Sequence, residues 1–219
     1  MARALIFVNG CLSNLESVHK LILPDDVLIA ADGGLQHILM LGLVPSVLIG
    51  DLDSLSSENR HVLETGDTRI YQYPHDKNET DFELALNYAV ETGYREMLIV
   101  AALGGRLDQT IGNLILLTDP ILARLDIRAD DGLEEAFFTR SVCRLRGNPG
   151  DLVSLIPWGG EATGVTTDGL RWPLSGENLK PHRTRGISNE LLGGMASVVI
   201  QSGLLLVVHR RQIVEKELL

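Results

Sequence analysis

Short apolar runs alternate with longer amphipathic stretches over the first 130 residues. The runs predict five β-strands, at residues 4–8, 27–31, 47–49, 69–73 and 97–101. Each run precedes a helix-like segment, which is the pattern of repeated βαβ units. Because the runs are nearly all apolar, with little polar alternation, we expect strands covered on both faces. The sequence therefore predicts an α/β fold with a parallel sheet between helix layers in a domain spanning residues 1–130.

Two of the intervening helices carry local signals. Thr80 and Glu83 have the spacing of a capping box ahead of an apolar face, and Gly93 is suited to end that helix. A second helix is expected from about Asp108 to residue 117, before Pro120 restricts its continuation.

The pattern changes after residue 130. Short β-prone runs at 137–146, 152–157, 164–170 and 195–209 are separated by Gly, Pro, Asn and Ser. Ser202-Gly203 lies between two apolar runs and predicts a hairpin turn. Since no helix of ordinary length is evident, residues 131–219 are expected to form a small antiparallel β domain.

Composition excludes several classes of protein. The formal net charge of −10 disfavours general nucleic-acid binding, and apolar runs such as 204–208 are too short to span a membrane. The first apolar run ends at Asn9-Gly10, too early for a secretory signal. Cys11 and Cys143 form no CxxC pair, so we expect no zinc site or disulfide, two buried thiols and a cytoplasmic location.

Aspartates follow four consecutive predicted strands. They are Asp32, the pair Asp51 and Asp53, Asp81, and Asp108. Parallel strands deliver their following loops to one edge of the sheet, so these carboxylates are expected to converge. Two carboxylates about 4 Å apart repel by roughly 4 kcal/mol at an effective dielectric constant near 20, and a hard divalent cation relieves that repulsion. An oxygen-only ligand set without cysteine favours Mg²⁺.

The same loops offer features that suit phosphate groups. Gly33, Gly34 and Gly105 permit close backbone approach, while Lys77 and Arg106 add positive charge. Neither a Walker loop nor a GxGxxG fingerprint is present, so we expect a different nucleoside triphosphate site. Taken singly, each aspartate is better explained as a turn or helix-capping residue. Only their coincidence on one edge favours a metal site.

Six motifs carry a family resemblance. They are Asp32-Gly33-Gly34, Gly50-Asp51-Leu52-Asp53-Ser54, Thr80-Asp81, Gly104-Gly105-Arg106-Leu107-Asp108, Gly169-Leu170-Arg171-Trp172 and Gly186-Ile187-Ser188-Asn189-Glu190. In this order the chain resembles the thiamine pyrophosphokinase family over nearly its whole length. The resemblance implies an α/β domain followed by a β-sandwich, a homodimer with active sites between subunits, and Mg²⁺-dependent transfer of pyrophosphate from ATP to thiamine.

The resemblance also implies roles for individual residues. The implied metal ligands are Asp51, Asp53 and Asp81, and the implied catalytic residues are Asp32, Asp81 and Asp108. The implied ligand-binding residues are Gly33, Gly34, Lys77, Thr80, Gly105 and Arg106 for the nucleotide, with Trp172, Ser188 and Asn189 near thiamine. Asp81 and Asp108 are both candidates for the proton acceptor.

Two positions depart from the family pattern, and two other functions stay open. Asn78 stands where relatives often carry a second aspartate, and Gln109 replaces a common histidine, so Gln109 offers no general base. The run from Asp51 to Ser54 also fits the nucleophile loop of an aspartate-dependent phosphatase. A non-catalytic protein that binds thiamine or nucleotide is the other alternative. The six histidines form no coherent set in the sequence.

Overall fold

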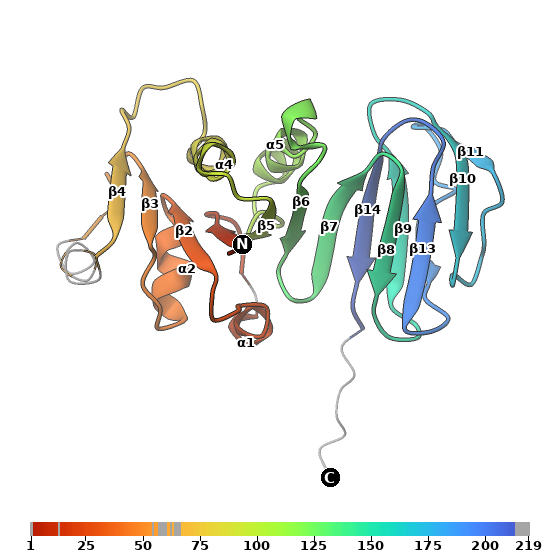
Figure 1. Cartoon of the computed structure of the whole chain (residues 1–219), viewed down its shortest axis with the longest axis horizontal. Helices are drawn as coiled ribbons and strands as arrows, with labels where there is room; N and C mark the ends of the chain where they lie inside the picture. The colour runs from red at the N-terminus through yellow and green to blue at the C-terminus, as the bar shows by residue number, and fades with distance from the viewer. Residues whose placement is uncertain are drawn as a thin grey trace, which may run out of the picture. The chain divides into compact units, whose positions relative to one another are not determined.

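The chain divides into two compact units (Figure 1). The structure, a computed structural model, describes residues 2–12, 14–53, 55–56, 61, 63 and 67–212. Unit 1 is Met1–Gly132 and unit 2 is Leu133–Leu219. Ser54, part of the predicted acidic motif, lies outside the described residues.

Unit 1 contains a parallel sheet. Its described strands are β1 (Ala4–Phe7), β2 (Val27–Ala31), β3 (Val47–Gly50), β4 (Arg69–Gln72), β5 (Glu96–Val100) and β6 (Asp126–Asp130). Their order is β6-β5-β1-β2-β3-β4, and every neighbouring pair is parallel. The predicted parallel α/β fold is confirmed. Strand β6 is additional to the five predicted strands, because its alternating Asp126, Arg128 and Asp130 interrupt the apolar pattern.

Helices cover the two faces of this sheet. They are α1 (Leu15–His19), α2 (Gly34–Met40), α4 (Asp81–Thr92) and α5 (Leu107–Leu116), with a 3₁₀ turn at Pro120–Leu122. Figure 1 shows α1 and α2 on one side of the sheet and α4 and α5 on the other. Leu5 and Phe7 of β1 pack with Val18 of α1 and Leu35 of α2 in one apolar cluster. Central strands are therefore buried because helices pack on both faces.

The edge strand β4 differs from the central strands. All four of its residues are exposed. The expectation that every strand would be covered on both faces is wrong for β4, which lies at the edge of the sheet. The run Arg-Ile-Tyr-Gln carries polar ends that suit this edge position.

The two helix predictions agree with the structure. Thr80 caps α4 by accepting the N–H of Glu83 on Oγ1 at 3.1 Å, and Gly93 ends the helix with φ at +96°. Helix α5 begins at Leu107, within one residue of the predicted start. None of the described helices has the length and apolar character that a membrane crossing requires. Both cysteines are free, but the prediction of two buried thiols is wrong, since Cys11 is exposed.

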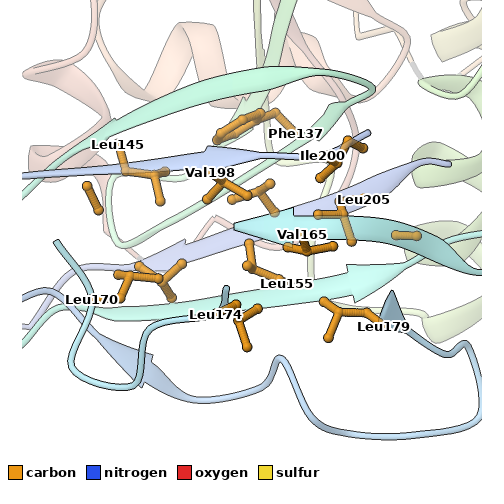
Figure 2. Close-up of a cluster of buried hydrophobic side chains, with 14 of the residues drawn as sticks. Phe137, Leu145, Leu155, Val165, Leu170, Leu174, Leu179, Val198, Ile200 and Leu205 are labelled. Atoms are coloured by element: carbon orange, nitrogen blue, oxygen red, sulfur yellow. The ribbon is translucent and has the colours of Figure 1, made fainter. Parts of the chain in front are cut away.

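Unit 2 is a sandwich of two antiparallel sheets. One has the order β12-β9-β14-β7, from Asn189–Glu190, Leu152–Pro157, Leu205–Arg210 and Glu134–Thr139. The other has the order β11-β10-β13-β8, from Glu177–Leu179, Ala162–Asp168, Met195–Val199 and Val142–Arg146. Figure 2 shows the apolar side chains between them, among them Phe137, Leu155, Val165 and Val198. This agrees with the predicted small β-sandwich.

Two strand predictions in unit 2 are wrong in detail. The run 137–146 is two strands, β7 and β8, which belong to different sheets. Ser202-Gly203 is a turn, but the strands around it, β13 and β14, also belong to different sheets and form no hairpin. Gly203 has φ at +98°, and a Cβ there would lie 2.6 Å from the Glu161 carbonyl oxygen. At both positions the chain thus passes from one sheet of the sandwich to the other, whereas the apolar pattern indicates only a turn.

Candidate active site

Loops at the carboxyl ends of β1, β2 and β5, together with the start of α4, line a cavity of about 600 Å³ in unit 1. Its lining residues are Val8, Asn9, Gly10, Cys11, Ala31, Asp32, Thr80, Asp81, Phe82, Gly104, Gly105, Arg106, Gln109 and Asn113. The predicted residues Asp32, Thr80, Asp81, Gly105 and Arg106 therefore lie around one hollow, as the parallel topology requires.

Backbone packing explains two of the predicted glycines. A Cβ on Gly34 would lie 2.0 Å from the Phe7 carbonyl oxygen, and one on Gly33 would lie 2.4 Å from the Asn9 side chain. These glycines are thus needed where the loops after β1 and β2 touch.

Asp32 lies among other acidic groups. Its φ is +42°, in the left-handed region that aspartate tolerates better than most residues. Burial raises the pKa of the Asp32 carboxyl; the Gly33 N–H opposes this rise, and the charges of Asp81 and Asp51 add to it. The structure therefore brings two of the predicted aspartates, Asp51 and Asp81, close enough to repel a third, Asp32. Such a group is stabilised by a cation or by a proton.

Lys77 reduces that repulsion only in part. Its Nζ lies 3.0 Å from Oδ1 of Asp81, four residues further along the chain, and 12% of the Lys77 side chain is exposed. That contact is an ion pair without hydrogen-bond geometry, because the buried Oδ1 makes no hydrogen bond within the described part of the chain. The Asp81 carboxylate thus keeps an acceptor for a further cation, and an all-oxygen donor set of this kind fits Mg²⁺.

Asp51 and Asp53 form a second part of the acidic edge, together with a histidine. One ligand atom from each of Asp51, Asp53 and His75 lies within 4.8 Å of the other two. The Asp53 N–H donates to Oδ1 of Asp51 at 3.1 Å, which orders the loop. His75 was not expected from the sequence. The signal that could have identified it is the β3–β4 register, in which residues 22 apart are partners, so Asp53 falls opposite His75.

Asp108 lies apart from this group. Its carboxylate binds the Arg106 guanidinium through two hydrogen bonds, of 2.6 and 3.1 Å, and 65% of its side chain is exposed. The Arg106 guanidinium lowers the pKa of Asp108, and Asp108 in turn raises the pKa of Arg106. Asp108 is absent from the cavity lining, whereas Arg106, Gln109 and Asn113 are in it. Buried Asn113, which sequence reasoning missed, donates to the Ala102 carbonyl at 2.9 Å and holds the loop after β5.

Unit 2 contains a second hollow, of about 350 Å³. Trp172, Ser188 and Asn189, all predicted site residues, line it together with Arg185 and Ile187. The Asn189 side chain accepts the Trp172 N–H at 3.0 Å and donates to the Trp172 carbonyl at 2.7 Å. Asn189 thereby fixes the backbone that carries the exposed indole ring.

Arginines surround this indole. The Arg171 guanidinium carbon lies 5.0 Å from the centre of the Trp172 ring and pairs with Glu190 at 2.8 Å. Arg185 pairs with Glu177 at 3.1 Å. Sequence reasoning assigned neither arginine a role. An exposed aromatic face beside arginines suits an aromatic ligand that carries a polar or anionic group.

Two family profiles match the chain. "Thiamin pyrophosphokinase, catalytic domain" matches residues 18–129, and "Thiamin pyrophosphokinase, vitamin B1 binding domain" matches residues 142–205. The thiamine pyrophosphokinase of Bacillus subtilis (strain 168) is 27% identical over 183 residues, which are 83% of this chain and 86% of that protein.

Solved structures agree on the fold. The crystal structure of thiamine pyrophosphokinase from Bacillus subtilis superposes with a TM-score of 0.86 at 24% identity, covering 96% of this chain and 100% of that one. Yeast thiamin pyrophosphokinase gives a TM-score of 0.76 at 16% identity, covering 95% of this chain and 86% of that one. At these identities the structures establish the fold alone.

Proposed function

The chain belongs to the thiamine pyrophosphokinase family, and from this premise we propose that it transfers the pyrophosphoryl group of ATP to the thiamine hydroxyl. The products are thiamine diphosphate and AMP. The observation that carries the proposal is the acidic edge of unit 1, where Asp51 and Asp81 both repel Asp32 beside a cavity of about 600 Å³. A triphosphate with its cation matches that charge and size.

We propose Asp51, Asp53 and Asp81 as the residues that hold Mg²⁺. Bound there, Mg²⁺ would neutralise phosphate charge and make the β-phosphorus accessible to attack. Support comes from the Oδ1 atom of Asp81, which is buried and makes no hydrogen bond among the described residues, and from the carboxylates of Asp51 and Asp53. No cysteine competes for the ion among these ligands.

Other residues in and beside the cavity bind and orient the triphosphate. Lys77, next to Asp81, and Arg106 supply positive charge for phosphate oxygens, and Gly105, with φ at +76°, lets the backbone approach them. Helix α4 begins at this cavity behind Thr80, so its first N–H groups favour an anion there. These contacts position the nucleotide for in-line attack, which is the main source of rate in phosphoryl transfer.

The choice between proton acceptors favours Asp81 over Asp108. The ion pair with Arg106 lowers the pKa of Asp108, which weakens it as a base, and its carboxylate is absent from the cavity lining. Asp81 lines the cavity, and its Oδ1 contacts only Lys77, at 3.0 Å, among the described residues. Asp108 then serves to orient Arg106.

Thiamine is assigned to unit 2. The exposed Trp172 ring offers an aromatic face for a heterocycle, and Ser188 and Asn189 offer polar groups beside it. A homodimer with active sites between subunits, as the family resemblance implies, completes the proposal, together with a cytoplasmic location in which both cysteines stay reduced. Sedimentation of the purified protein tests the dimer.

The test is incubation with thiamine, ATP and Mg²⁺, followed by separation of the adenine and thiamine products. We expect AMP and thiamine diphosphate in equal amounts. Asp51→Asn should lower turnover by about 100-fold or more, since it removes a charge that holds the metal. Asp126→Asn, an exposed carboxylate at the start of β6, is the matched control and should keep full activity.

Each alternative function has its own signature in this assay. An aspartate-dependent phosphatase would release phosphate without thiamine and would give no AMP coupled to thiamine diphosphate. A binding protein would retain both ligands without turnover. Either outcome, or near-normal turnover of the Asp51→Asn variant, contradicts the proposal.

A further inference from the structure

His75 lies three residues past the end of β4, and Asp53 lies three residues past the end of β3. The register pairs Val47 with Arg69 and Gly50 with Gln72, and the Tyr73 N–H still donates to the Gly50 carbonyl at 3.0 Å. Continued by three residues, the same offset of 22 places His75 opposite Asp53. The backbone therefore brings the imidazole to the carboxylates, as the ligand atoms within 4.8 Å confirm.

Backbone contacts hold both sides of this grouping. Leu52, between the two aspartates, is buried with φ at +64° and packs in the core of unit 1. The Gln72 side chain donates to the Asp51 carbonyl at 3.2 Å. On the other side, the Lys77 N–H donates to the His75 carbonyl at 3.1 Å. Both Asp51 and Asp53 thus flank an anchored residue, and His75 sits at the start of a hydrogen-bonded turn.

The His75 side chain makes no hydrogen bond or ion pair among residues 2–12, 14–53, 55–56, 61, 63 and 67–212. One of its ring nitrogens lies within 4.8 Å of a carboxylate oxygen of Asp51 and of Asp53, a spacing at which the three residues could hold one metal ion. An imidazole nitrogen beside two carboxylate oxygens is a donor set for first-row transition ions, whereas Mg²⁺ prefers oxygen ligands alone.

We infer that His75 is a nitrogen ligand of a divalent-metal site completed by Asp51 and Asp53, and that this ligand makes the site favour Mn²⁺ over Mg²⁺. The inference rests on the proposed function in one respect: the ion held here is taken to be the one that accompanies the triphosphate. The inference goes beyond the proposed function in two respects. It adds a nitrogen ligand to a site otherwise made of aspartates, and it predicts tighter binding of Mn²⁺ than of Mg²⁺.

The experiment uses the whole protein with Mn²⁺ alone. Free Mn²⁺ is followed by its electron paramagnetic resonance signal in a titration, and Mg²⁺ affinity is measured by competition. Electron spin echo envelope modulation of the bound Mn²⁺ then detects a directly bound imidazole through ¹⁴N coupling. The variants are His75→Ala, His75→Asp and the control His19→Ala, which changes an exposed histidine at the end of α1.

The wild type and the His19→Ala control should bind Mn²⁺ with ¹⁴N coupling. In His75→Ala the coupling should vanish and Mn²⁺ affinity should fall by about tenfold, with a smaller loss of Mg²⁺ affinity. His75→Asp should also lack the coupling but recover binding through oxygen, with a lower preference for Mn²⁺. Unchanged secondary structure in circular dichroism shows that the variants are folded.

Three outcomes would overturn the inference: no Mn²⁺ binding by the wild type, bound Mn²⁺ without ¹⁴N coupling, or the same preference for Mn²⁺ in His75→Ala. Failure of the proposed function is seen separately, because it is read from thiamine diphosphate and AMP and not from metal binding. A protein that makes thiamine diphosphate but shows no ¹⁴N coupling keeps the proposed function and loses only the role of His75.

Discussion

Two groupings in this chain contain the same side chains, two carboxylates and a histidine, in opposite environments. The edge group, at the carboxyl ends of β3 and β4, is Asp51, Asp53 and His75. The buried group, inside unit 2, is Glu135, Asp151 and His209. Two of the three edge residues are exposed, whereas every member of the buried group is below 9% exposed. Composition alone therefore does not distinguish a binding site from a structural cluster.

Most polar atoms of the buried group have partners within the protein. Oδ2 of Asp151 lies 3.0 Å from Nε2 of His209 and accepts the Asn148 N–H at 2.9 Å, while Oδ1 accepts the Gln212 N–H at 2.9 Å. Glu135 lies 3.5 Å from Nδ1 of His209, which is too long for a strong hydrogen bond, so its effect is electrostatic attraction.

These contacts have opposite effects on the two partners. Burial alone would raise the pKa of Asp151, but the N–H groups of Asn148 and Gln212 and the His209 ring outweigh it and lower that pKa. Attraction to Glu135 raises the pKa of His209; burial opposes it, and Asp151 reinforces it. The contacts of His209 and Asp151 thus favour the charged form of each, whereas the described contacts of the edge group include only one hydrogen bond to a carboxylate oxygen, from the Asp53 N–H to Asp51.

The largest expected difference between the groups is in stability. Asp151→Asn removes a buried charge that His209 and two N–H groups depend on, so the free energy of unfolding should fall by about 3–5 kcal/mol. Asp51→Asn should change it by no more than about 0.5 kcal/mol, since it breaks no such network. Urea titrations of both variants give these values. Equal losses would remove the distinction between a structural and a binding group.

A smaller loss of stability is expected when a new methyl group crowds Asp151 and His209. A Cβ on Gly147 would lie 2.5 Å from Oδ2 of Asp151 and 2.8 Å from Nε2 of His209. Gly147→Ala should therefore cost about 1–3 kcal/mol by forcing these side chains apart. In the control Gly112→Ala, the new methyl group in α5 meets open space and should stabilise by up to about 1 kcal/mol. Thermal unfolding compares the two, and a tolerated Gly147→Ala would mean that the pair is loosely held.

The smallest effect is the dependence of stability on pH. Because the pKa of His209 is raised in the folded state, its contribution is complete below the unfolded value of about 6.5 and is lost as pH rises through the folded value. The lowered pKa of Asp151 acts oppositely: its contribution is present above about 3.9 and is lost as pH falls through the folded value. In urea unfolding from pH 6 to 8.5, the free energy of unfolding of the wild type should decline with pH, and that of His209→Gln should not. The same dependence on pH in both proteins would contradict the role assigned to His209. Arg211, which opposes the charge of His209, is the other charged group to consider.

The sequence predicts the part of the site that depends on strand order. Apolar runs identify β1, β2, β3 and β5, and the rule that parallel strands share one carboxyl edge predicts where Asp32, Asp51 and Asp81 lie. The cap at Thr80 is predicted because it depends on residues three apart. Such features are local, or follow from topology alone.

Features that depend on register or on side-chain choice are not predicted. His75 joins the edge group through the offset between β3 and β4, which periodicity does not contain. The Asp108 side chain forms an ion pair with Arg106 instead of lining the cavity. The sequence does not show which of these contacts the carboxylate makes. The chain connects the two sheets of unit 2 at residues 140–141 and 202–203. These connections were not predicted, because the apolar pattern does not show to which sheet each strand belongs.

The anchoring of Leu52 couples the acidic loop to the folding equilibrium of unit 1. Its side chain belongs to the same apolar cluster as Leu5 and Phe7, so loosening the cluster also separates the carboxylates on either side of it. By thermodynamic linkage, an ion that binds only the ordered loop also protects the native state from melting. Selection for tighter ion binding and selection for thermal tolerance would then act on the same leucine.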